Sequence, residues 1–129
     1  MKTQYTMTLT LLAGVAIGAV AVQGLHAQAK LKAYSVVEVE PLAGATISTS
    51  YLDTVRKAIV NAHGRALRTI NGKVFHIEGA PAPVRVGIVE WDSADDAKAF
   101  YTSKAWTDFA PEREKAQKTI RRYIVEVEP

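Results

Sequence analysis

The run VRVGIVEW at residues 84–91 constrains the fold more than any other part of the chain. Its residues are apolar at both odd and even positions, and only Arg85 and Glu90 are charged. Successive side chains of a strand point to opposite faces of a sheet, so a strand that is apolar at both parities needs cover on both faces. The sequence therefore predicts a β-strand over 84–91, in a sheet with two buried faces.

Two other runs predict partners for this strand. Residues 33–39, AYSVVEV, are β-branched and aromatic, and Pro41, which cannot donate to a strand ladder, closes the run. Residues 123–127, YIVEV, form the last run of this kind. Both are hydrophobic at both parities, so they need the same cover.

A further strand region lies at residues 65–77, RALRTINGKVFHI. Asn71-Gly72 separates two β-prone runs, and this pair suits the positive φ angles of a two-residue type I′ turn. The alternative is one long strand with a bulge near Gly72. Residues 78–83, EGAPAP, are expected to form a loop.

Two capping patterns predict helices between the strands. Ser50 and Asp53 have the spacing of a capping box, and Gly64 takes the position just past a helix C-terminus. Ser93 and Asp96 repeat the spacing before a second helix. The first helix carries an apolar stripe at helical spacing, formed by Leu52, Val55, Ile59 and Ala62.

The second helix is expected to end at Ser103, and Pro111 to lie in the first turn of a further helix. The resulting order is β-α-β-β-α-β, an α+β fold with a ferredoxin-like antiparallel sheet and its helices on one face. The other face is apolar and large for a monomer to expose. We therefore expect a homodimer that pairs sheet to sheet, through whichever of Val36, Ile88 and Ile124 point away from the helices.

The N-terminal segment has the layout of a secretory signal peptide. Lys2 precedes residues 3–29, which carry no Lys, Arg, Asp or Glu, and Ala27-Gln28-Ala29 supplies the small residues that signal peptidase accepts. We expect cleavage after Ala29, export to the periplasm or the medium, and one mature domain over residues 30–129. An uncleaved membrane anchor is the alternative, although the apolar run is short against the ~20 residues that a membrane-spanning helix needs.

Composition narrows the possible functions. The 16 Lys and Arg residues against 13 Asp and Glu give a net charge of only +3, spread along the chain, so neither nucleic acid nor an anionic membrane is implied as a partner. With no cysteine, the chain has neither a lipobox nor disulfides. His63 and His76 share no metal-ligand spacing, so no metal site is predicted. Phosphate-loop, dinucleotide and nucleophile-elbow motifs are absent from the sequence.

Arg113 is the leading candidate for a ligand-binding residue. Trp106, Phe109, Arg113 and Ala116 follow one another at spacings of 3, 4 and 3, which places the arginine on an apolar stripe. A buried arginine needs a partner, because its unpaired charge costs several kcal/mol. That partner is either an internal carboxylate, Glu38 or Glu90, or an anionic ligand such as a carboxylate or enolate at the end of a pocket.

Weaker candidates for catalysis are Glu90, His63 and His76. Glu90 lies in an apolar strand, where it could act as a base with a raised pKa or be neutralised by an arginine. His63 suits the C-terminal end of the first helix through the helix dipole, and His76 faces either a cleft or solvent. Several aromatic residues could form the core or wall a flat apolar site: Tyr34, Trp91, Tyr101, Trp106 and Phe109.

Three runs resemble the domain of unknown function 1330 family. FYTSKAWTDFAPER, residues 100–113, resembles its spaced aromatic, Tyr, Ser and Pro-x-Arg pattern. HGRALRTINGKVFHIEG, residues 63–79, resembles its Gly-Arg strand and Glu-Gly turn, and VRVGIVEWDSADDAKAFY, residues 84–101, resembles its third strand and capped helix. The resemblance extends over residues 33–127. It departs at the first helix, where the family shows an Asp and two Tyr and residues 46–52 of this chain contain only Tyr51.

The resemblance implies a dimeric α/β-barrel, in a superfamily that includes cofactor-free monooxygenases, isomerases and haem-binding proteins. We expect an exported dimer that binds a small apolar or anionic molecule between helices and sheet, without a cofactor. The alternatives are a cofactor-independent oxygenase or isomerase, with Glu90 or a histidine as base, and a structural dimer without a ligand. Arg113 is expected near Glu90, at one end of a pocket lined by Trp91, Tyr101 and Trp106.

Overall fold

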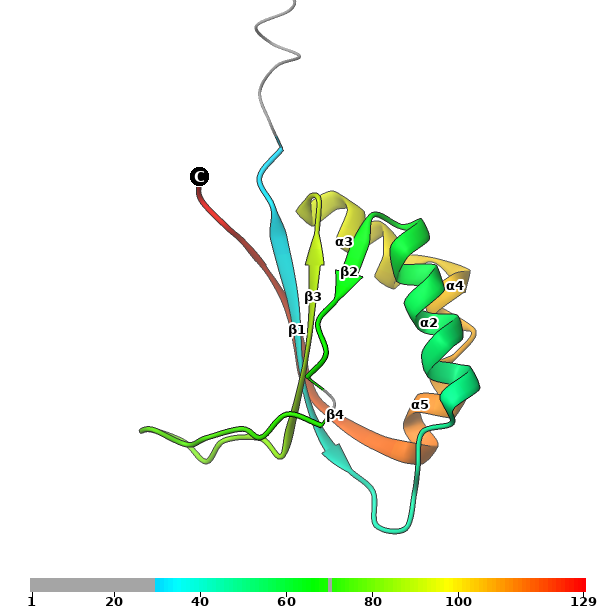
Figure 1. Cartoon of the computed structure of the whole chain (residues 1–129), viewed down its shortest axis with the longest axis vertical. Coiled ribbons are helices and arrows are strands. Elements are labelled where there is room, and N and C mark those ends of the chain that lie inside the picture. Colours follow the sequence, from blue (N-terminus) through cyan, green and yellow to red (C-terminus); the bar gives the residue numbers. More distant parts are fainter. Residues whose placement is uncertain (1–29, 70) are drawn as a thin grey trace, which may run out of the picture. The chain divides into compact units, whose positions relative to one another are not determined.

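The computed structural model describes residues 30–69 and 71–129, of which residues 31–129 form one compact unit. Four strands make an antiparallel sheet in the order β2-β3-β1-β4 (Figure 1). Their bounds are Ala33–Pro41 for β1, Gly64–Ala66 for β2, Arg85–Trp91 for β3 and Gln117–Glu126 for β4. This order and the α+β class confirm the ferredoxin-like fold. The predicted signal peptide lies outside the described residues.

The helices cover one face of the sheet, as Figure 1 shows. They are α2 (Thr49–Asn61), α3 (Ala94–Thr102), α4 (Lys104–Thr107) and α5 (Ala110–Ala116). Pro111 lies in the first turn of α5 and Ser103 caps the C-terminus of α3, as predicted. The four-residue α4 was not predicted. Among the described residues, no helix combines the length and apolarity needed to cross a bilayer.

Both ends of α2 differ from the prediction. The helix is capped by Ser48, whose Oγ accepts a hydrogen bond from the Tyr51 amide at 3.2 Å, and Ser50 already lies inside the first turn. The residue with positive φ at its C-terminal end is His63, at 64°, and not Gly64. By contrast, α3 begins as predicted, because Ser93 Oγ accepts from the Asp96 amide at 3.1 Å.

Gly64 instead allows a close approach between α2 and the sheet. A Cβ added at this residue would lie 2.7 Å from Ile59 Cγ2 and 2.7 Å from Trp91 Cζ3. Both neighbours belong to the hydrophobic core, where Trp91 is fully buried and contacts Phe100 at a ring-centroid distance of 5.1 Å. The glycine is therefore needed for packing rather than for ending the helix.

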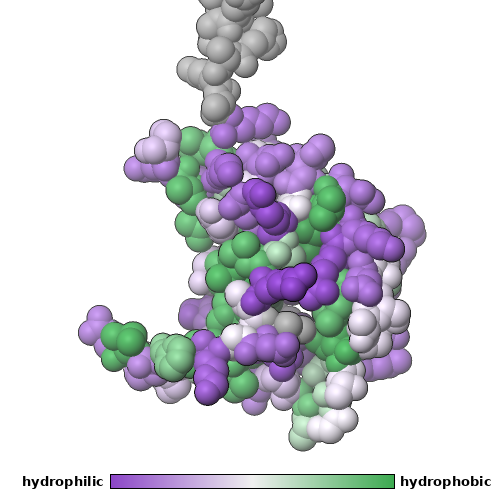
Figure 2. Space-filling view, in the orientation of Figure 1, coloured by the Kyte–Doolittle hydropathy of each residue, from purple (hydrophilic) through white to green (hydrophobic). Residues whose placement is uncertain are grey.

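The expected hairpin or long strand over residues 65–77 is wrong. Strand β2 ends at Ala66, and residues 71–84, here called the arm, run out from the sheet and back, with a bend at residues 78–80 and Gly79 at φ 84° (Figure 1). Phe75 is 76% exposed and Ile77 87% exposed, so the described chain offers no surface on which these residues pack. In the space-filling view of Figure 2, hydrophobic residues are visible on the arm.

Strand β4 begins earlier than the predicted 123–127, because Gln117 is already extended where α5 ends. Its register with β1 pairs Arg122 with Val37 and Arg121 with Glu38. Neighbouring residues of a strand point to opposite faces. Consequently the two adjacent arginines lie on opposite faces of the sheet, and this arrangement determines the composition of the pocket.

Candidate functional site

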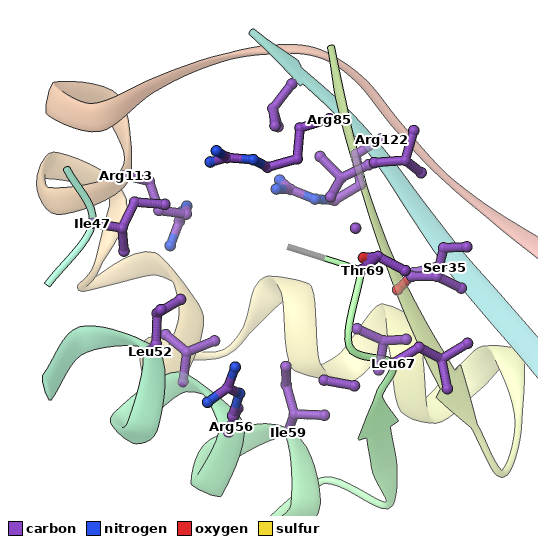
Figure 3. A pocket seen from close by; sticks show the side chains of 18 of the residues that line it. Ser35, Ile47, Leu52, Arg56, Ile59, Leu67, Thr69, Arg85, Arg113 and Arg122 are labelled. Carbon is purple, nitrogen blue, oxygen red and sulfur yellow. The ribbon is translucent and has the colours of Figure 1, made fainter. Parts of the chain in front are cut away.

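A pocket of about 180 Å³ lies between the helices and the helix-covered face of the sheet (Figure 3). Its walls are mainly apolar and come from β1, β3 and α2, with aromatic side chains from α2, α3 and α4. Four arginines line it, and the described lining residues include no Asp, Glu or His. The apolar lining includes Val37, Val39, Ile47, Leu52, Val55 and Ile59, and the arginines are Arg56, Arg85, Arg113 and Arg122.

Arg122 reaches the pocket from β4. Its guanidinium carbon lies 4.6 Å from the Trp106 ring centroid and 5.3 Å from that of Tyr101. Burial lowers the pKa of Arg122, and the nearby Arg113 lowers it further. Its Nε is buried and has no hydrogen-bond partner among the described residues. A desolvated cation with an unused donor, beside a second cation, is an arrangement that an anion would stabilise.

Arg113 enters the same pocket from α5. Its guanidinium carbon stacks 3.6 Å from the Trp106 ring centroid, and Nη1 donates to the Trp106 carbonyl at 2.9 Å. Figure 3 shows Arg113 on the helix side, with the tips of Arg85 and Arg122 pointing toward it from the sheet. The aromatic face and the carbonyl hold the side chain without neutralising its charge.

The expected ion pair between Arg113 and Glu38 or Glu90 is therefore wrong. Both carboxylates lie on the face of the sheet that the helices leave uncovered. Glu38 accepts two hydrogen bonds from Arg121, which hold the pKa of its carboxyl below the usual value. The alternation of side chains along β1 and β3 separates these acids from Arg113 by the thickness of the sheet.

Glu90 belongs to a polar cluster at one end of that uncovered face. It accepts hydrogen bonds from Tyr34 Oη at 2.9 Å, Lys32 Nζ at 3.1 Å and Arg65 Nη2 at 2.5 Å. The bonds from Tyr34, Lys32 and Arg65 lower the pKa of Glu90 to about 2. The hypothesis of a base with a raised pKa is wrong, whereas neutralisation by an arginine is confirmed.

Two pocket tyrosines contribute hydroxyl groups. Tyr101 Oη lies 2.7 Å from Ser35 Oγ, which in turn accepts from Trp91 Nε1 at 2.9 Å. Tyr51 contacts Phe109 edge to face at 5.6 Å. Burial raises the pKa of both tyrosines, and Arg113 and Arg122 oppose that shift. Both hydroxyls therefore stay protonated near neutral pH.

The structure places only some of the predicted ligand-binding residues together. Arg113, Tyr101 and Trp106 line the pocket. Trp91 is 0% exposed and belongs to the core behind Tyr101, with ring centroids 5.9 Å apart. Tyr34 lies on the opposite face of the sheet with Glu90.

The predicted histidines lie elsewhere. His63 follows the C-cap residue of α2, and its carbonyl accepts from the Asp92 amide at 3.2 Å, whereas His76 is exposed on the arm. Across the described residues, no group of three potential His, Cys, Asp or Glu ligands is close enough to hold a metal. The three candidate catalytic residues are thus outside the pocket.

Sequence reasoning missed Arg122, together with Arg56, Arg85 and Tyr51. The available signal was the adjacent pair Arg121-Arg122, because two consecutive residues of a strand cannot face the same side. An outer depression, lined by Leu42, Glu114, Lys118 and Thr119, shares Arg113, Gln117 and Arg122 with the pocket. The two arginines thus stand between the pocket and this depression.

Comparison with known proteins gives a family and a fold. A family described as domain of unknown function (DUF1330) matches residues 32–127, which confirms the resemblance. No curated protein matches the sequence significantly. The solved structure of a protein of unknown function from Rhodopseudomonas palustris aligns with a TM-score of 0.54 and 11% identity, over 86% of this chain and 92% of that one.

A dimeric protein of unknown function with a ferredoxin-like fold, from Bacteroides fragilis, aligns with a TM-score of 0.40 and 11% identity. That alignment covers 75% of this chain and 95% of the other. At 11% identity, a structural likeness concerns the fold alone. Only the Rhodopseudomonas palustris structure, with its TM-score of 0.54, supports the fold.

Proposed function

We propose that this chain, which belongs to the DUF1330 family, binds a small carboxylate with a planar, apolar body in the pocket between helices and sheet. The observation that carries the proposal is Arg122, a partly buried cation that stacks beside Trp106 with its Nε unpaired among the described residues. Arg113 adds a second cation over the same indole ring. An anion between them would relieve the repulsion between two guanidinium groups and satisfy the unused donor.

The rest of the pocket suits an apolar body. Aliphatic side chains from β1 and α2 face Tyr101 and Trp106, and such walls favour a flat ring or an unsaturated chain. A carboxylate fits the paired arginines because it can accept several guanidinium hydrogen bonds at once. The apolar and anionic features expected from the sequence thus describe two ends of one ligand.

Binding is favoured over catalysis in this proposal. Proton abstraction from a ligand needs a base within hydrogen-bond reach, and Glu90, His63 and His76 do not line the pocket. The tyrosines cannot replace them near neutral pH, because burial raises their pKa values. An oxygenase or isomerase would need a reactive group that the described lining residues do not supply.

We also propose that the protein forms a homodimer through the uncovered face of the sheet. On the uncovered face, Val36 of β1 pairs in register with Ile88 of β3 on one side and with Tyr123 of β4 on the other. These three residues form an apolar strip that crosses three strands. Ile124 packs against the core and so points to the helices. The ion pairs of Glu38 and Glu90 flank the strip on its two sides, one toward each end of the strands. A second copy, with its sheet against this face, would bury the strip.

Export is the remaining part of the proposal. The apolar N-terminal segment and the Ala27-Gln28-Ala29 junction support a mature protein that begins at Lys30. N-terminal sequencing of protein from the periplasm or the medium should find Lys30. Recovery of intact Met1 from a membrane fraction would replace export by anchoring.

Thermal unfolding with benzoate and with benzamide tests the pocket. These two probes share a planar ring, and only benzoate carries a charge. We expect benzoate to raise Tm of the wild type, since a ligand at a hundred times Kd stabilises by ~2.7 kcal/mol. Benzamide should have little effect, and the Arg113→Met/Arg122→Met variant should lose the benzoate response. The matched control is Arg68→Met, at an exposed arginine outside the pocket. An equal response of the double variant and the control would refute the proposal.

A further inference from the structure

Exposed hydrophobic side chains of the described chain concentrate in two places. Of twelve large hydrophobic residues that are exposed, four lie on the arm and four lie on or just after β4. The arm group is Val74, Phe75, Ile77 and Val84, and the β4 group is Ile120, Tyr123, Val125 and Val127. Two such surfaces on one chain are complementary in chemistry, since each needs an apolar partner.

The arm has the properties of a strand without a partner. Residues 73–83 make no backbone hydrogen bond to any other described residue. Phe75 and Ile77 are two residues apart, so an extended backbone places them on one side. Holding an extended segment in one conformation costs about 1–2 kcal/mol per residue in backbone entropy, and contacts within the described chain offset little of that cost.

Strand β4 has the properties of an acceptor. It is an edge strand of ten residues that, among the described strands, pairs with β1 alone, so its other edge presents amide and carbonyl groups with no described ladder partner. Tyr123 and Val125 are 44% and 47% exposed, and their register partners Val36 and Tyr34 lie on the uncovered face. An extended segment that docks here would gain backbone hydrogen bonds and apolar contacts together.

The direction of the arm selects a second copy as the partner. In Figure 1 the arm leaves the sheet on the side that the helices do not cover. Its base, at Pro81 and Pro83, borders a depression beside the Glu38–Arg121 ion pair of its own sheet. The proposed homodimer would place the second copy on this side, within reach of the arm.

We infer that the arm of each copy docks along β4 of the other, with Phe75 and Ile77 against Tyr123 and Val125. In a two-fold dimer this contact occurs twice, so both arms and both β4 edges gain a partner. The inference rests on the proposed homodimer and adds to it a reciprocal clasp along the β4 edge of the contact between the sheet faces.

Cross-linking between two differently tagged chains tests the clasp. The chain has no cysteine, so introduced thiols are the sole targets of a short bis-maleimide. One chain carries Ile77→Cys, and the other carries Val125→Cys or, as control, Val60→Cys. Val60 is 65% exposed on α2, which lies on the helix-covered side. We expect a cross-linked heterodimer with Val125→Cys and none with Val60→Cys. Dimers that cross-link equally with both or with neither would overturn the clasp.

Sedimentation of matched variants separates the clasp from the homodimer. Phe75→Ser/Ile77→Ser should raise the dimer Kd at least about tenfold through lost apolar burial, whereas Val60→Ser should not change it. These residues are exposed in the single chain, so folding should be unaffected. A dimer whose Kd is the same in all three proteins contradicts the clasp alone. A wild-type protein that stays monomeric at micromolar concentration contradicts the homodimer, and the clasp with it.

Discussion

Arg122 packs its cation against aromatic rings, beside a second cation. A like charge and partial desolvation both work against its ionised form, and stacking on Trp106 offsets part of that cost. We therefore expect Arg122→Met to leave the free energy of unfolding of the ligand-free protein unchanged or raise it by up to about 2 kcal/mol, after allowance for solvent screening. Urea denaturation measures this change. A loss above about 2 kcal/mol would mean that the arginine has a structural partner.

Glu90 provides a pH-dependent contribution to stability. Its pKa is about 2 in the folded protein, against 4.5 as the ordinary value. A depressed carboxyl pKa stabilises the fold above the unfolded-state value, and this contribution is lost as pH falls through the folded-state value. Between pH 5 and pH 2, Glu90→Gln should therefore lose less stability than the wild type, as followed by Tm. The exposed Glu40→Gln should behave as the wild type does, and identical curves for all three would contradict the assignment.

Sequence reasoning at the residue scale identified a cation in the pocket but not its partners. The 3, 4, 3 spacing correctly placed Arg113 inward, because helix periodicity is a local property. Its separation from Glu90 depends on strand register, which arises only when distant segments pair. Arg122 was missed for a related reason, since the last strand was predicted to begin at residue 123 and actually begins at Gln117.

At the scale of elements, Gly64 allows α2 and the sheet to pack closely against each other. Gly64→Ala would place a methyl group 2.7 Å from the Ile59 and Trp91 side chains, which overpacks the core. We expect a loss of about 1–3 kcal/mol in the free energy of unfolding, measured by urea denaturation. A variant as stable as the wild type would show that α2 can shift away from β3 at no cost.

Local sequence signals predicted an element well where the contacts that stabilise it come from residues nearby in the sequence. Ser93 caps α3 as expected because its partner, the Asp96 amide, is three residues away. The turn signal at Asn71-Gly72 failed because a hairpin also needs strands that pair, and residues 73–83 form no such ladder with any other part of the chain that the structure describes. The arm is therefore an element whose conformation cannot be read from local preference.

At the scale of the whole molecule, three predicted strands are hydrophobic at both odd and even positions. This pattern predicted a sheet with one face covered by helices and a second apolar face. If that second face is the dimer interface, Ile88→Asp places two unpaired charges in it. We expect the dimer Kd to rise by about 100-fold or more, since one unpaired buried charge costs about 3 kcal/mol. Val60→Asp, on the helix-covered side, is the control. Analytical ultracentrifugation that finds equal dimer Kd values for both variants would contradict this interface.

The central claim is that Arg113 and Arg122 together hold a carboxylate, and the side-chain Nε–H resonances of the arginines report on it directly. Titration with benzoate should shift the Arg122 and Arg113 resonances saturably and with one common Kd, because the buried Arg122 Nε gains an acceptor. The exposed Arg68 should not move, and benzamide should have no matching effect. Pocket resonances that stay fixed under benzoate, or that move equally with benzamide, would contradict the claim.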